Sequence, residues 1–140
     1  MSKIASIPPS AAQDQISDIV AMLRAKLEGI QAIYLFGSHA TGHATASSDI
    51  DIGVLLPRPM DNVDRWNLQQ ELSISGAGVD VDLVDLRAAT TVFQTQIIAT
   101  GQYLFVSDPL AVDYFEMYAY SDYARLNEER AEILSDLKKV

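Results

Sequence analysis

The segments AIYLFGS, at residues 32–38, and DIDIGVL, at residues 49–55, decide which fold this sequence predicts. The first is a run of apolar, β-branched and aromatic residues that ends in glycine and serine, which is typical of a buried strand followed by a tight turn. The second begins with alternating acidic and apolar residues and then becomes wholly apolar, which indicates a strand whose polar face is confined to its start. VDLVDL, at residues 81–86, repeats the alternation and predicts another strand over about residues 79–86.

Helices are predicted around these strands. A capping box formed by Ser10 and Gln13 begins the first helix, and Gly29 ends it. The helical spacing of apolar residues predicts three further helices, at about 62–75, 90–100 and 109–137. In the helix that Gly76 closes, three residues are expected to face inward: Val63, Trp66 and Leu72.

A loop and a fourth strand complete the predicted order of elements. Residues 39–48 are small and polar, which indicates a loop that can hold a helical turn, and residues 103–106 are typical of a strand at the edge of a sheet. The sequence therefore predicts one domain over residues 1–140, of the α/β (α+β) class. We expect a short mixed sheet with helices packed on one side and a long C-terminal helix.

Composition excludes several classes of protein. Apolar residues make up 49% of the 140 residues and charged residues 21%, which is ordinary for a globular domain and excludes disorder. The chain has no cysteine, which excludes disulfides, thiolate metal sites and thiol nucleophiles. No apolar run is long enough to span a membrane, and the first residues lack the apolar core of a signal peptide. We therefore expect a cytoplasmic protein.

The net charge of −9, from 10 basic and 19 acidic residues, argues against direct binding to nucleic acid or to an anionic membrane. Binding to phosphate needs an excess of lysine and arginine. A polyanionic substrate is still compatible with this charge where a metal ion supplies the positive charge. The acidity has two interpretations, solubility alone or a carboxylate cluster that holds a cation, and the positions of the acidic residues decide between them.

Three aspartates are the candidate metal ligands. Asp49 and Asp51 lie two residues apart on one strand, so their side chains share a face, and Asp82 lies inside another apolar strand. If the two strands are neighbours, three carboxylates converge, and such a cluster needs a cation to stay ionised. Oxygen donors suit Mg²⁺ better than zinc, and two ions could be held, as in nucleotidyl transfer. The alternative interpretation is that the aspartates face solvent.

The turn Gly37-Ser38 is the second candidate element. A buried strand that ends in Gly-Ser presents N–H groups and a hydroxyl where a helix can begin, and such a turn can bind phosphate. It is not a P-loop, because no Gly-Lys-Ser/Thr follows. By itself, Gly-Ser is a common turn.

Four other titratable residues are given lesser roles. Asp80 shares the face of Asp82 but lies near the start of the strand, whereas Asp85 points to the opposite face. Asp85 is therefore expected to be solvated or to cap a helix. His39 and His43 are interpreted as polar loop residues, because neither has an assigned partner.

The spacing Gly37-Ser38-x10-Asp49-x-Asp51 resembles the signature of the DNA polymerase β-type nucleotidyltransferase superfamily. The segment around Asp82 resembles the strand that carries the third carboxylate of that family. The chain is similar in particular to the minimal nucleotidyltransferases that are antitoxins in HEPN–MNT toxin–antitoxin modules. The resemblance implies a polymerase β-like fold in which the three aspartates bind the metal ions and catalyse transfer. It also implies that Gly37 and Ser38 bind the nucleotide.

The same resemblance implies the function. It indicates an antitoxin that is a Mg²⁺-dependent protein adenylyltransferase, which transfers AMP from ATP to a tyrosine of the cognate HEPN-family ribonuclease toxin and so neutralises it. Two alternatives stay open: a small-molecule nucleotidyltransferase similar to those that modify aminoglycosides, and a non-catalytic antitoxin that acts by binding alone.

One departure from the family pattern and one further candidate element stand out in the sequence. Many family members have arginine where this chain has His39 and Thr41, so a cationic contact to the triphosphate is either absent or supplied elsewhere. The helix at 109–137 is a candidate partner-binding element, because aromatic residues are enriched in interfaces; the alternative is amphipathic packing on the core with exposed tyrosine hydroxyls. Five aromatic residues gather near its start: Tyr114, Phe115, Tyr118, Tyr120 and Tyr123.

Overall fold

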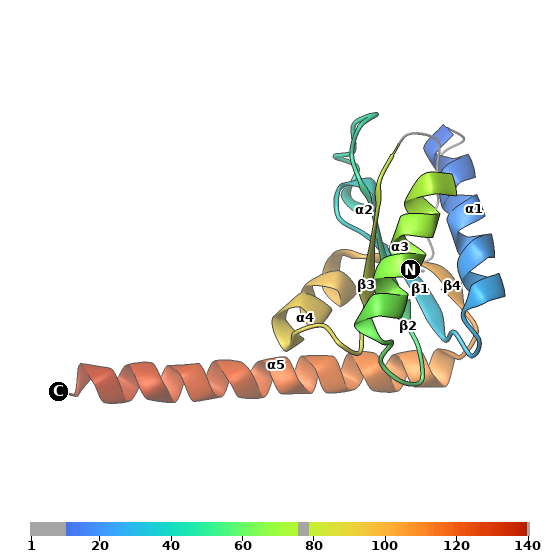
Figure 1. Ribbon diagram of the computed structural model, residues 1–140. Coiled ribbons are helices and arrows are strands. Elements are labelled where there is room, and N and C mark those ends of the chain that lie inside the picture. The colour runs from blue at the N-terminus through green and yellow to red at the C-terminus, as the bar shows by residue number, and fades with distance from the viewer. Residues whose placement is uncertain (1–10, 76–78, 140) are drawn as a thin grey trace.

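The structure, a computed structural model, describes residues 11–75 and 79–139 (Figure 1). Its elements are, in order, α1 (Ala11–Lys26), β1 (Ala32–Phe36), α2 (Ser38–Thr41), β2 (Ile50–Leu55), α3 (Asn62–Ser75), β3 (Val81–Asp85), α4 (Thr91–Thr100), β4 (Gln102–Val106) and α5 (Pro109–Lys138). Each predicted helix and strand is present, and α2 is the helical turn that the polar loop was expected to allow. The predicted capping box at Ser10 and helix end at Gly76 lie outside the described residues.

The four strands form one mixed sheet in the order β3-β2-β1-β4. β1 runs antiparallel to both β2 and β4, whereas β2 runs parallel to β3. β4 lies at an edge of the sheet, as predicted. The pairing of β2 with β3 places Asp51 directly opposite Asp82, so this one parallel contact positions the acidic residues of the sequence motif.

Helices cover both faces of the sheet, so the prediction that they lie on one side is wrong. Ile33 and Leu35 of β1 belong to the core that contains α1 and α3. Ala32, Tyr34 and Phe36 belong to a second core that contains α4 and α5 (Figure 1). The cause lies in β1, all of whose residues are buried: a strand that is apolar on both faces needs a cover on both.

Helix α3 seals the outer edge of β3 with polar side chains that are four residues apart. Arg65 donates to the carbonyl of Leu83 at 3.1 Å, and Gln69 accepts from the N–H of the same residue at 2.9 Å. Ser73 accepts from the N–H of Val81 at 3.0 Å. These bonds occupy strand groups that would otherwise be open to pairing with another chain.

This polar row also explains an error in the prediction for α3. Leu72 is buried, as predicted, but the side chains of Val63 and Trp66 are 65% and 55% exposed. Leu68 takes the inward position instead. Once the leucines and the adjacent polar row face the sheet, the helical period leaves Val63 and Trp66 on the solvent side.

Helix α5 is fixed to the sheet by a carboxylate that two tyrosines share. The hydroxyls of Tyr34 and Tyr103 both donate to Glu116, at 2.8 Å and 2.6 Å. The two rings pack edge to face with their centroids 5.1 Å apart. Burial, followed by the carboxylate of Glu116, raises the pKa of both tyrosines, so each stays a hydrogen-bond donor in the folded state.

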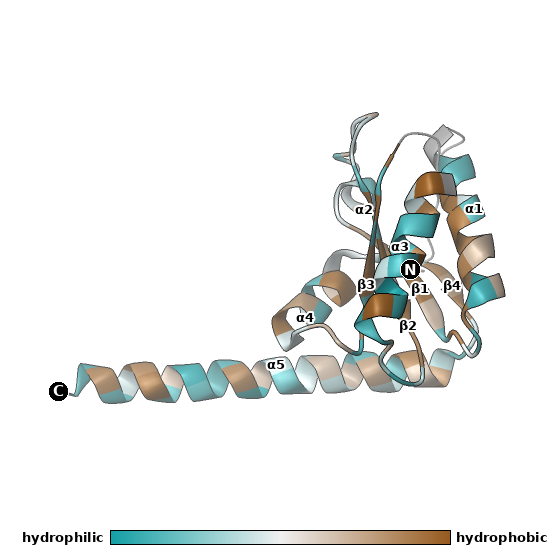
Figure 2. Cartoon of the chain, viewed as in Figure 1, coloured by the Kyte–Doolittle hydropathy of each residue, from teal (hydrophilic) through white to brown (hydrophobic). Residues whose placement is uncertain are grey.

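The aromatic residues at the start of α5 divide between the core and the solvent. Phe115 is buried, whereas Tyr114 and Tyr118 are exposed and stack on each other with ring centroids 6.5 Å apart. Figure 2 shows apolar and polar residues alternating along α5 to its C-terminal end. Although α5 has 30 residues, no helix in the described ranges, α5 included, is long and apolar enough to cross a membrane.

We expect the tyrosine pair to make the fold sensitive to alkaline pH. Because the folded state holds the pKa of Tyr34 and Tyr103 above the usual value of 10.0, their contribution to stability is complete below that pH and is lost above it. The free energy of unfolding should fall there by about 1.4 kcal/mol per pH unit for each of these tyrosines. Urea unfolding between about pH 8 and 11.5 should give Tyr34→Phe a shallower slope than the wild type. Equal pH dependence of the free energy of unfolding in the two proteins would contradict a raised pKa of Tyr34 in the folded state.

Candidate active site

The three aspartates of the motif come together at one end of the sheet. Asp51 of β2 is in register with Asp82 of β3, and Asp49 lies two residues before Asp51 on the same chain segment. Burial and then the negative charges of Asp82 and Asp49 raise the pKa of the Asp51 carboxyl. The condition on which the predicted cluster depended, that the two strands are neighbours, is therefore met.

The cluster lies on the sheet face that α4 and α5 cover, at an end that stays open. Ile50 and Ile52 point into the core with α1 and α3, so Asp51 between them points to the opposite face. Asp51 is half-buried, whereas Asp49 and Asp82 are exposed. The carboxylate of Asp51 is thus partly desolvated, and those of Asp49 and Asp82 are accessible to a ligand.

Gly37 allows the turn after β1 to approach Asp51 closely. Phe36 is in register with Asp51, and Gly37 follows with a positive φ of 72°. A Cβ atom at Gly37 would overlap the carboxylate of Asp51. The carbonyl of Gly37 accepts the N–H groups of Ala40 and Thr41, at 3.1 Å and 3.2 Å, which closes the short helix α2. Gly37 and Ser38 therefore adjoin the acidic cluster, where the motif predicts them.

His39 adjoins the acidic cluster, although the sequence led us to interpret it as a polar loop residue without a partner. The side chain is half-buried, and its Nε2 lies 3.2 Å from the carbonyl of Ser48, the residue before Asp49. The charge of His39 also acts on Asp51, lowering its pKa, but more weakly than burial and the two aspartates raise it. The available signal was its place directly after Gly-Ser. His43, by contrast, is exposed and contacts only the nearby Thr41 among its described side-chain partners, at 3.1 Å.

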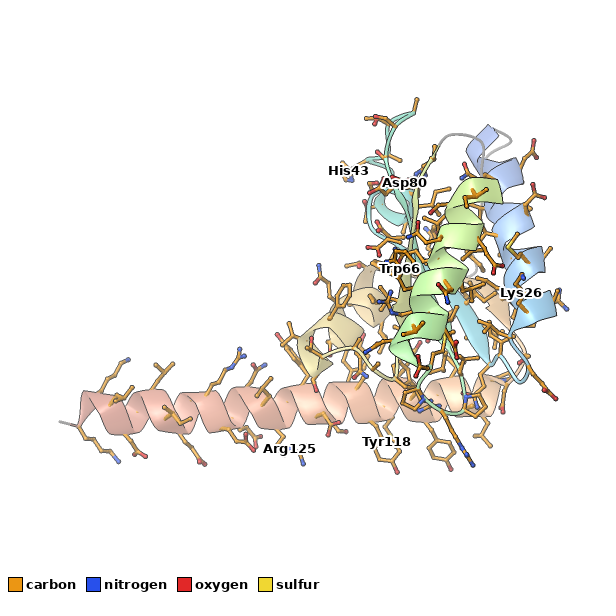
Figure 3. The ribbon with its side chains drawn as sticks, in the orientation of Figure 1. Lys26, His43, Trp66, Asp80, Tyr118 and Arg125 are labelled. Atoms are coloured by element: carbon orange, nitrogen blue, oxygen red, sulfur yellow. The ribbon has the colours of Figure 1, made fainter. Side chains whose placement is uncertain are left out.

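The other two aspartates of this region lie outside the cluster. Asp85 is buried, which corrects the expectation that it is solvated: it accepts the N–H of Met60 at 2.6 Å and that of Arg87 at 3.1 Å. It does so because the loop before α3 passes over the end of β3. Asp80 lies directly before β3, near the start of the strand as predicted, and is exposed (Figure 3).

Two open pockets flank the acidic cluster. One, of about 430 Å³, is lined by residues that include Asp82, Arg65 and Phe93. The other, of about 340 Å³, is lined by residues that include Gly37 and Phe93. The ring of Phe93 packs edge-on against that of Phe36, with centroids 5.7 Å apart, and so forms part of both walls. Arg65 brings a positive charge to the pocket that Asp82 lines, a contribution that its position on a predicted helix did not reveal.

The donor chemistry of the cluster fits a hard divalent cation. In the described part of the chain, no three acidic, histidine or cysteine side chains are gathered tightly enough to hold a metal ion as they stand. The main chain nevertheless brings three carboxylates to one place, where their mutual repulsion is what a cation would relieve. Carboxylate oxygens are the donors that Mg²⁺ prefers.

Comparison with known proteins decides the family. The sequence model of the family described as polymerase beta, nucleotidyltransferase matches residues 17–110, which is more than half of the chain. The chain belongs to this nucleotidyltransferase family. The resemblance that the Gly-Ser and Asp-x-Asp motif indicated is therefore confirmed, and the matched residues contain β1, β2, β3 and the whole acidic cluster.

Several relatives of this nucleotidyltransferase act in toxin–antitoxin complexes. It is 40% identical over 119 residues to the protein adenylyltransferase MntA of Shewanella oneidensis, covering 85% of this chain and 84% of MntA. It resembles a chain in the crystal structure of a toxin–antitoxin with AMP-PNP, with a TM-score of 0.76, 38% identity, and coverage of 89% and 97% of the two chains. A complex of tri-AMPylated Shewanella oneidensis HEPN toxin with MNT antitoxin gives a TM-score of 0.73, at the same identity and coverage.

We expect Gly37→Ala to impair nucleotide binding more than it impairs folding. Gly37 combines a φ of 72° with a ψ of −153°, a conformation that is essentially confined to glycine, so alanine there should lower the free energy of unfolding by about 1–3 kcal/mol. In addition, the new Cβ would push the Asp51 carboxylate out of the cluster. Titration of the variant with Mg²⁺ and a non-hydrolysable ATP analogue should show much weaker binding.

Gly42→Ala is the matched control for this variant. Gly42 also has a positive φ, of 80°, but a Cβ there would meet nothing within 4 Å. Because Gly42 has a left-handed conformation, with a ψ of 12°, this variant should lose about 1–2 kcal/mol of stability and keep its affinity for the nucleotide. Equal affinities of the two variants would show that contact between Gly37 and Asp51 does not matter to the site.

Proposed function

We propose that this chain is an antitoxin that acts as a Mg²⁺-dependent protein adenylyltransferase, transferring AMP from ATP to a tyrosine of its cognate HEPN ribonuclease toxin. The observation that carries the proposal is the parallel pairing of β2 with β3, which sets Asp51 opposite Asp82 beside the Gly37 turn. The relationship to MntA supports the nature of the acceptor.

The three aspartates have the role of metal ligands in this proposal. Asp49, Asp51 and Asp82 would hold Mg²⁺, as two ions, and Gly37 and Ser38 would contact the phosphates of ATP. When bound, Mg²⁺ supplies positive charge that stabilises the triphosphate and the departing pyrophosphate. This explains how a chain with a net charge of −9 could bind a polyanion.

The chemical step is an in-line displacement at the α-phosphorus. The oxygen of the acceptor hydroxyl forms a bond to the α-phosphorus while the bond to the bridging oxygen of the β-phosphate breaks, and pyrophosphate leaves with that electron pair. The proton of the hydroxyl passes to a carboxylate. Asp82 is the best placed of the three to take it, because it is exposed and lines the pocket of about 430 Å³.

An acceptor from another protein suits the shape of the site. Both pockets beside the cluster are open, and α4 and α5 leave the end of the sheet that carries the aspartates accessible. A transferred AMP group would add bulk and negative charge beside the site of a ribonuclease, where RNA must bind. Neutralisation of the toxin would then need catalysis in addition to binding.

Co-expression with the toxin tests this proposal. We expect the wild-type chain to add AMP to the toxin and to restore growth, and Asp51→Ala to do neither, because the loss of one ligand weakens binding of the metal at the transition state. Asp49→Ala and Asp82→Ala should behave like Asp51→Ala. Intact mass of the purified toxin and growth of the cells are the two measurements.

Asp80→Ala is the matched control, because Asp80 is an exposed aspartate two residues from Asp82 on the same segment. It should retain transfer and neutralisation. An unmodified toxin that Asp51→Ala still neutralises fully would overturn the enzymatic proposal in favour of binding alone. Transfer of AMP to an aminoglycoside, with none to the toxin, would favour the small-molecule enzyme.

A further inference from the structure

The C-terminal half of helix α5 projects from the domain without cover. A helix of 30 residues is about 45 Å long, and its buried residues are Val112, Phe115 and Ala119, all within its first half. Figure 1 shows that α5 crosses α4 and continues past it. An isolated helical segment of this length is marginally stable in water, so a projecting helix is typical of a surface that a partner completes.

The projecting half carries an apolar stripe on the same side as the packed half. At 100° per residue, Leu126, Ile133 and Leu137 fall on the helix face that Phe115 and Ala119 turn toward the domain. Leu134 lies at the edge of this face. We call these four leucine and isoleucine residues the tail stripe. Three of them are largely exposed: Ile133 (60%), Leu134 (58%) and Leu137 (65%).

The tail stripe faces the side on which the domain and its active site lie. The stripe shares the helix face that Phe115 and Ala119 turn toward the domain, whereas Tyr118 and Arg125 lie on one flank of the stripe, about 80–100° from Leu126. Helix α5 packs on α4, and its projecting half continues beyond α4. The tail stripe and α4 therefore face the same open space between the two helices. Helix α4 also supplies Phe93 and Gln96 to the pocket that contains Gly37.

Acidic residues border the tail stripe at the spacing of a helix pair. Asp122, Glu129 and Asp136 are seven residues apart and lie along one flank of the stripe. The ion pairs of Asp122 with Arg125 (3.1 Å) and of Asp136 with Lys139 (3.8 Å) are exposed, and such pairs are readily exchanged. On the other side, Arg130 falls between Leu137 and Leu134, so the stripe favours a partner helix that has apolar residues at its centre and lysine or arginine along the edge that meets the acidic flank.

We infer that the tail stripe docks a helix of the acceptor protein, and that this partner fills the angle between α4 and the projecting half of α5. The inference rests on the proposed function for the identity of the partner. The stripe continues a face that already packs against the domain, and the acceptor would come to lie beside the pocket lined by Gly37 and Phe93. Docking there raises the local concentration of the acceptor hydroxyl at the site.

Charge distinguishes this occupant from a second copy of the chain. Two copies would each bring a net charge of −9 and would repel each other. A ribonuclease, by contrast, needs a basic surface to bind RNA, and such a surface is complementary to the acidic border of the stripe. Tyr118 lines a pocket with Phe115 and with Gln94 of α4, so the stacked pair of Tyr114 and Tyr118 belongs to the packed half of α5 and is not part of the tail stripe.

The double variant Ile133→Glu/Leu137→Glu tests the inference, because glutamate preserves helix propensity while it removes the apolar surface. We expect its affinity for the cognate HEPN protein, measured by calorimetry, to fall at least about 30-fold. Transfer of AMP at limiting HEPN protein should fall with it, and binding of a non-hydrolysable ATP analogue should not change. Ala124→Glu/Ser135→Glu adds the same charge to the opposite side of the same segment and should bind the HEPN protein like the wild type.

Each outcome separates the docking surface from the proposed function. If the wild type adds AMP to the HEPN protein and Ile133→Glu/Leu137→Glu binds and modifies it equally well, the inference is wrong and the proposed function stands. If the wild type binds the HEPN protein through the stripe but adds no AMP, the proposed function fails alone. A free chain that is dimeric, and that the stripe variant makes monomeric, would assign the stripe to a second copy and overturn the inference.

Discussion

Repulsion among Asp49, Asp51 and Asp82 is the constraint on which the rest of the structure depends. Parallel pairing of β2 with β3 holds two of these carboxylates in register, and burial denies Asp51 part of its hydration. A cluster of this kind persists only in a fold that is stabilised elsewhere. The two apolar cores, one on each face of the sheet, provide that stability. Gly37 then lets the neighbouring turn approach without adding a side chain.

One face of the sheet stabilises the fold, and the other carries the candidate site. The face under α1 and α3 is apolar, and α3 also closes the edge of β3 with Arg65, Gln69 and Ser73. The face under α4 and α5 carries the aspartates at its open end, and Glu116 anchors α5 there through two tyrosines. The same helix therefore connects the core beneath the site with a surface available to a partner.

Local patterns in the sequence predicted most of the fold, and long-range contacts account for the errors. Alternation identified the strands and placed the three aspartates correctly, because side-chain direction in a strand is a local property. The prediction that Val63 and Trp66 face inward was wrong because hydrogen bonds from α3 to the edge of β3 set the rotation of that helix. Helical periodicity does not reveal such bonds. The burial of Asp85 likewise depends on a loop that crosses it.

The central claim, that the three aspartates form one cation-dependent site, is tested most directly by the free energy of unfolding of the wild type and of Asp51→Asn, each with and without Mg²⁺ and a non-hydrolysable ATP analogue. At a ligand concentration of about 100 times the dissociation constant, the wild type should gain about 2.7 kcal/mol. Asp51→Asn should be more stable than the wild type without the ligand, because a repelled charge is gone, and should gain far less with it. An equal gain in both proteins would contradict the claim.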